Sequence, residues 1–145
     1  MSLSSSSVVG MWRLTSRHDV DSSGKRHVDP ILGADPLGML SFSETHFAAQ
    51  FMKRDRSQAP DTRQPVQGAN NSSAVNGYDA YFGTYSLEGS GTLKVRLEGA
   101  IAAANIGSEF ERHIQVRDEQ LTIQLATSSA DGTPVTRTLT FSRLG

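Results

Sequence analysis

The stretch AYFGTYSLEGSGTLKVRLEG at residues 80–99 gives the clearest fold signal in this chain. Its two halves alternate between apolar and polar side chains, as β-strands with one buried face do. Leu93, Val95 and Leu97 share one face of the second half. Glu88-Gly89-Ser90-Gly91 separates the halves and is typical of a tight turn. The stretch therefore predicts an antiparallel hairpin.

Similar alternating runs, separated by turn residues, recur on both sides of this hairpin. We expect further strands at residues 8–18, 25–28, 38–42, 46–53, 109–117, 121–125 and 135–141. A meander of about eight or nine strands leaves two open edges, and closure into a barrel protects them. The sequence therefore predicts an all-β, up-and-down antiparallel barrel of about eight to nine strands, with at most a short helix near residues 73–79.

Composition indicates one domain that is held together by packing. The 145 residues suit a single core, and we expect residues 8–145 to form it after a flexible N-terminal segment at 1–7. The chain has no cysteine, which excludes disulfides and thiolate chemistry. Residues 54–76 are rich in Pro, Gln, Asn and Ser, which indicates either a functional flap or a poorly ordered loop.

Charge and hydropathy restrict the partners of the chain. The 14 Lys and Arg residues balance 15 Asp and Glu residues, so no net field favours nucleic acid or an anionic membrane. No apolar run approaches the roughly 20 residues of a membrane span, and residues 1–7 lack the pattern of a signal peptide. We therefore expect a cytoplasmic protein with no nucleic-acid and no membrane partner.

A tryptophan near the start of the chain and an arginine in a late strand form one sequence pattern. Gly10-Met11-Trp12 begins the first expected strand, and Arg112 lies with Phe110 on the apolar face of residues 109–117. This combination resembles the lipocalin pattern, in which Gly-x-Trp closes the floor of the barrel and a late arginine lies across the indole. A guanidinium can stack on an indole while its donors reach carbonyl groups. The resemblance implies that Gly10, Trp12 and Arg112 close the barrel.

A closer resemblance covers most of the chain. It is similar to the bacterial and fungal family of small lipocalin-like domain proteins, which are calycin-like β-barrels. The matching motifs are Gly10-Met11-Trp12-Arg13-Leu14, Gly38-Met39-Leu40-Ser41-Phe42, Gln50-Phe51-Met52 followed by Arg54-Asp55-Arg56, Tyr78-Asp79-Ala80-Tyr81-Phe82-Gly83-Thr84-Tyr85, and Arg112. The family usually has a histidine in place of Arg96 and a bulky aromatic in place of Asn105 or Ile106. Some relatives lie among genes of secondary metabolism, but the resemblance implies a fold more firmly than a function.

Two tyrosines are candidate ligand-binding residues. Tyr81 and Tyr85 share one face of their strand with Gly83 between them, which leaves a gap bounded by two hydroxyl groups. Such a pair can orient a ligand or donate a proton. The alternative is that both rings pack in the core with their hydroxyls at its edge. Phe110 and Arg112 join the candidates because their strand face is apolar.

Residues 46–53 carry apolar side chains on both faces, so alternation does not decide which face points inward. Gln50 and Met52 lie on one face, and Phe47 and Phe51 lie on the other. If Gln50 points inward, it needs a polar partner, and a ligand is one candidate. Arg137, which alternates with apolar residues, is either a second inward charge or a rim residue.

The sequence has no motif for metal binding, nucleophilic catalysis or nucleotide binding. The histidines are His18, His27, His46 and His113, and they share no metal-ligand spacing. The sequence also has no nucleophile elbow, phosphate loop or dinucleotide fingerprint. It therefore predicts no metal and no cofactor.

These observations favour a barrel that binds a small hydrophobic or aromatic metabolite. One alternative is a cofactor-independent isomerase, cyclase or dehydratase that uses Tyr81, Tyr85 or an inward polar side chain. Another alternative is a protein-interaction module, in which an exposed strand edge or residues 54–76 dock a partner or a second copy in a homodimer.

Overall fold

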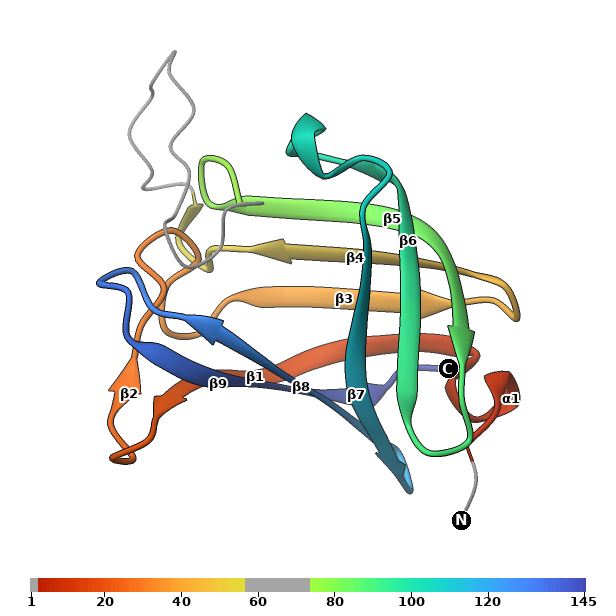
Figure 1. Ribbon diagram of the computed structural model, residues 1–145. Coiled ribbons are helices and arrows are strands. Elements are labelled where there is room, and N and C mark those ends of the chain that lie inside the picture. The colour runs from red at the N-terminus through yellow and green to blue at the C-terminus, as the bar shows by residue number, and fades with distance from the viewer. Residues whose placement is uncertain (1–2, 57–73) are drawn as a thin grey trace.

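The computed structural model describes residues 3–56 and 74–145, and these residues form a closed antiparallel barrel (Figure 1). The strands are β1 (Gly10–Asp21), β2 (Arg26–His27), β3 (Leu37–Phe42), β4 (His46–Met52), β5 (Tyr78–Leu87), β6 (Thr92–Ala100), β7 (Glu109–Arg117), β8 (Gln120–Ser128) and β9 (Pro134–Arg143). From β3 onward each strand pairs with the next in the chain, and β1 closes the barrel by pairing with both β3 and β9. The predicted all-β, up-and-down barrel is confirmed: the described residues give eight barrel strands, with β2 as an extra strand on β1.

Helical structure in the described residues is short. Helix α1 (Ser5–Val8) includes residues 5–7 of the segment that composition predicts to be flexible, and the 3₁₀ helix η2 (Ala103–Asn105) lies between β6 and β7. The helical turn expected near residues 73–79 is wrong over its described part. Asn76 and Gly77 have positive φ angles of 53° and 79°, and they form a tight turn that leads directly into β5. Most of the expected flap at 54–76 lies outside the described residues.

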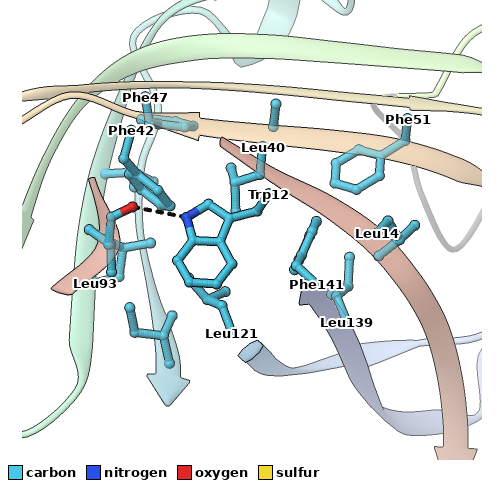
Figure 2. Close-up of a cluster of buried hydrophobic side chains, with 14 of the residues drawn as sticks. Trp12, Leu14, Leu40, Phe42, Phe47, Phe51, Leu93, Leu121, Leu139 and Phe141 are labelled. Atoms are coloured by element: carbon cyan, nitrogen blue, oxygen red, sulfur yellow. Dashed lines mark hydrogen bonds between the residues drawn. The ribbon is translucent and has the colours of Figure 1, made fainter. Parts of the chain in front are cut away.

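One end of the barrel, which we call the floor, is filled by apolar side chains (Figure 2). Trp12 is completely buried at its centre, and its indole Nε1 donates a hydrogen bond of 2.9 Å to the carbonyl of Val8 in α1. The surrounding residues are Leu40, Phe42, Phe47, Leu93, Leu121 and Phe141. Helix α1 and the C-terminus lie at this end (Figure 1), so both chain ends help to close it.

The arginine over the indole is Arg143, and the expectation of Arg112 in this place is wrong. The guanidinium carbon of Arg143 lies 4.2 Å from the Trp12 ring centre, and its nitrogens donate to the carbonyls of Ser7 and Val9 at 3.0 and 2.9 Å. The strand pairing explains this exchange. Trp12 lies opposite Arg143 on β9, whereas the guanidinium of Arg112 lies over another ring.

Gly10 allows this closure because a side chain would not fit there. Its φ angle is +130°, and a Cβ atom would lie 2.2 Å from the carbonyl oxygen of Gly145. The same carbonyl accepts a 3.0 Å hydrogen bond from the amide of Met11. The C-terminus can therefore lie directly against the start of β1.

A bulge in β1 reverses the inside and outside faces of its second half. The pairing with β9 shifts between Leu14 and Ser16, so one extra residue is inserted on β1. Strict alternation predicts Ser16 inward and Arg17 outward, and this is wrong for Arg17. Arg17 and Asp19 are 6% and 2% exposed, and both lie inside the barrel. The bulge therefore brings two charged side chains into the interior.

Strand β5 bends sharply on its way from one end of the barrel to the other (Figure 1). The bend depends on Gly83, where a Cβ atom would lie 1.9 Å from the carbonyl oxygen of Arg96 on β6. The β5–β6 register shifts at this point. Phe82 covers Gly99 on the outside of the same bend. Tyr81 and Tyr85 thus share one face of β5 but lie on opposite sides of the bend.

Candidate functional site

The barrel contains a cavity of about 300 Å³ beyond the apolar floor. Its lining comes from β1, β4 to β9 and the connections before β3 and after β6. The apolar part of the lining is Leu32, Phe51, Leu97, Ala100, Phe110, Leu125 and Leu139. The polar part is Arg17, Asp79, Tyr81, Asn105, Ser108, Arg112, Thr127 and Arg137. The wall therefore combines apolar side chains with a similar number of polar and charged ones.

Arg137 is held in the wall by a buried aspartate. Its Nε and one terminal nitrogen donate to the two carboxylate oxygens of Asp19, at 2.8 and 3.0 Å. The two residues lie directly opposite each other on β1 and β9. This two-point geometry fixes the plane of the guanidinium. Arg137 is therefore oriented before any ligand arrives.

Arg17 is held in a similar way by Asp29, in the connection between β2 and β3. Its Nη2 lies 3.2 Å from Oδ2 of Asp29, while Oδ1 accepts the amides of Ile31 and Leu32 at 2.7 and 3.1 Å. Leu32 is 1% exposed and lines the cavity. The buried carboxylate thus folds this connection across the end of the barrel and points an apolar side chain inward.

Arg112 has a different environment from the other two arginines. Its guanidinium carbon lies 4.1 Å from the centre of the Phe110 ring, and its Nη1 donates to the carbonyl of Glu111 at 2.9 Å. Burial lowers the pKa of Arg112, and the neighbouring charge of Arg137 lowers it further. Burial is therefore the main feature that disfavours the charged form of this side chain.

Tyr81 lies between the aromatic part of the wall and the charged part. Its ring centre is 6.0 Å from that of Phe47 and 6.4 Å from that of Phe51. Burial raises the pKa of Tyr81 to about 12, and the charge of Asp79 adds to this effect. The hydroxyl group consequently stays protonated at neutral pH and can donate a hydrogen bond into the cavity.

Comparison with known proteins agrees with this geometry. The sequence profile of a family described as a lipocalin-like domain matches residues 9–144, which is nearly the whole chain. The chain belongs to the lipocalin-like domain family. No curated protein matches it. The described part of this lipocalin-like barrel also has no helix that is long and apolar enough to span a membrane.

The lipocalin-like barrel brings together three of the residues that the sequence suggests for ligand contact. Tyr81, Phe110 and Arg112 all line the cavity. Tyr85 does not join them, because it lies on the floor side of the bend in β5. Its hydroxyl donates a 2.6 Å hydrogen bond to the carbonyl of Ser43, and its ring centre lies 4.9 Å from that of Phe42.

Gln50 and Met52, whose strand face the alternation leaves undecided, do not line the cavity. On β4 the buried residues are Phe47, Ala49 and Phe51, so the opposite face points out of the barrel. Gln50 is exposed and accepts a 3.2 Å hydrogen bond from the hydroxyl of Tyr78. The larger apolar groups take the inward face because ring burial stabilises more than burial of an amide.

The sequence interpretation missed most of the charged wall. Alternation places Arg17 on the outward face, because the bulge in β1 has no local signature, and Asp19 lies beyond the expected strand at residues 8–18. Asp79 lay at the margin of an expected helical turn. The alternation of Arg137 with apolar residues is the signal that predicts it either inward or at the rim. In the described ranges, no group of three or more histidine, aspartate or glutamate side chains is arranged to hold a metal.

Proposed function

We propose that this protein binds a small hydrophobic or aromatic metabolite inside its barrel. The observation that carries the proposal is the 300 Å³ cavity, whose wall combines aromatic rings with oriented polar groups. Protein interiors are normally packed without voids much larger than a water molecule. A space of this size, at the lower end of the range for ligand pockets, supports a binding role.

Catalysis by the tyrosines has less support. A general acid works best when its pKa is near the working pH. Burial raises the pKa of Tyr81 to about 12, and the hydroxyl of Tyr85 is bonded to the carbonyl of Ser43. Both features suit groups that hold or pack rather than groups that transfer protons. We therefore place binding ahead of an isomerase, cyclase or dehydratase activity.

A fluorescence titration with N-phenyl-1-naphthylamine tests the proposal, because this neutral probe becomes bright in apolar surroundings. We expect saturable binding to the unaltered protein. Ala100→Phe should weaken it about tenfold or more by placing a ring in the cavity, since a filled site excludes the probe. Ala104→Phe is the matched control, because it adds the same ring at an exposed position in η2.

Three results would count against a cavity site. These are the absence of saturable binding, equal binding by the Ala100→Phe and unaltered proteins, and an equal loss in the Ala104→Phe control. A thermal unfolding curve for each variant shows that it is folded before the titration.

A further inference from the structure

The arginines of the cavity wall differ in how their charges are compensated. Arg17 and Arg137 each bind an aspartate that lies behind the cavity lining, Asp29 and Asp19 respectively. For Arg112, the described ranges 3–56 and 74–145 contain no carboxylate within ion-pair distance. Its polar contact is the carbonyl of Glu111 at 2.9 Å. Arg112 thus brings a positive charge to the cavity that these ranges do not neutralise.

This charge is also poorly solvated. Arg112 is half-buried, and one face of its guanidinium is covered by Phe110 at 4.1 Å. A desolvated charge raises the free energy of the folded protein unless an opposite charge or several hydrogen bonds compensate it. An anion in the cavity would supply both, because a carboxylate accepts two parallel hydrogen bonds from a guanidinium.

The surroundings of Arg112 restrict the kind of anion. Tyr81 supplies a protonated hydroxyl in the same cavity, and the one positive charge of Arg112 is matched by an anion with a single negative charge. The apolar side chains Leu97, Phe110 and Leu125 line the same cavity. A singly charged head on a flat apolar body fits this distribution.

We propose that the ligand is an aromatic or conjugated monocarboxylate, with its carboxylate on Arg112 and its apolar body along the Phe110 side of the cavity. This inference rests on the proposed function, since it names the chemical class of the ligand for the same site. Arg112 then acts as the residue that selects a charged ligand over a neutral one of the same shape.

The test compares 2-naphthoate with 2-naphthamide, which has the same ring system without the charge, by isothermal titration calorimetry at neutral pH. We expect the unaltered protein to bind 2-naphthoate about tenfold to hundredfold more tightly, as hydrogen bonds to a charged group predict. Arg112→Gln should remove this preference and leave 2-naphthamide binding in place. Arg117→Gln is the matched control, because Arg117 is on the same strand but exposed outside the barrel.

The outcomes separate this inference from the proposed function. If both probes bind equally well, or if the two arginine variants lose 2-naphthoate affinity to the same extent, the carboxylate assignment is overturned while cavity binding stands. If neither of these probes nor N-phenyl-1-naphthylamine binds, the proposed function fails as well. Arg112→Met, which keeps an apolar contact with Phe110, replaces Arg112→Gln if the latter does not fold.

Discussion

The two ends of the barrel use the same strands for opposite purposes. At the floor, the inward residues are apolar (Figure 2). Helix α1 and Arg143 cover Trp12 at this end. At the cavity end, the next inward residues of the same strands include Arg17, Arg112 and Arg137. A filled apolar end stabilises the fold by burial, whereas a charged and hollow end gives up packing.

This division indicates that stability and ligand binding are located at different ends of one barrel. An arginine occurs at both ends but in different roles. Arg143 covers an indole and satisfies two backbone carbonyls, while Arg112 faces a cavity. Substitutions at the floor should therefore change stability, and substitutions at the cavity end should change ligand binding.

The largest expected effect is at the floor. Trp12→Ala should lower the free energy of unfolding by about 3–5 kcal/mol, because it leaves a large void in a packed apolar cluster. Phe110→Ala should cost about 1 kcal/mol, because that ring already borders a cavity. Urea unfolding at one temperature measures both. Similar losses of unfolding free energy in the two variants would contradict the division. If Trp12→Ala does not fold, Trp12→Phe replaces it, with a smaller expected loss.

The next effect concerns the buried ion pair at the cavity end. Asp19→Asn should cost about 3 kcal/mol, because it removes the carboxylate that holds the buried guanidinium of Arg137. The double variant Asp19→Leu with Arg137→Met should lose less, because neither charge of this buried pair remains. Lys94→Met is the surface control, since its 3.0 Å pair with Glu88 is exposed and its loss should change stability far less. If the loss of unfolding free energy in the double variant equals the sum of the losses in the two single variants, the pair is not coupled.

A smaller effect separates the two arginines. Arg143→Met should lower the free energy of unfolding by about 1–2 kcal/mol through loss of the indole contact and two hydrogen bonds, with probe binding unchanged. Arg112→Met should change stability by less than about 0.5 kcal/mol while it weakens 2-naphthoate binding. Calorimetric binding and urea unfolding of both variants give the comparison. A variant that lowers both the free energy of unfolding and the affinity for 2-naphthoate would contradict the separation of the two arginines.

The smallest effect is a pH dependence at the β8–β9 turn. The hydroxyl of Ser129 and the side chain and amide of Thr133 lower the pKa of Asp131 to about 2. A depressed pKa means that the unfolded chain binds the proton first, so this contribution is complete above about pH 4 and is lost as the pH falls toward 2. Asp131→Asn should therefore show a shallower loss of stability in that window. Equal acid slopes, measured by urea unfolding at several pH values, would contradict this.

The barrel itself was predictable from local patterns. Strand β7 occupies the expected residues 109–117, and the hairpin of β5 and β6 follows the turn at Glu88-Gly89-Ser90-Gly91. Alternation within a strand and glycine within a turn depend on neighbouring residues alone. Phe110 and Arg112 were expected inward for the same reason, and both line the cavity.

The candidate site was predictable in part. Residues 46–53 have apolar groups on both faces, so their alternation could not exclude Gln50 and Met52 from the interior. Similarly, Tyr81 and Tyr85 share a face, but the bend at Gly83 places one at the cavity and the other at the floor. The distance between two residues on one face depends on strand curvature, which the partner strand imposes.

Local sequence was sufficient for the strands, the turns and the meander, because each depends on a few consecutive residues. The partner of the Trp12 indole, the inward turn of Arg17 and the pairing of Asp19 with Arg137 needed the closed barrel. These features depend on the register between β1 and β9, strands at opposite ends of the chain, and a single inserted residue exchanges the two faces of a strand. The charge distribution of the cavity therefore follows from how the barrel closes.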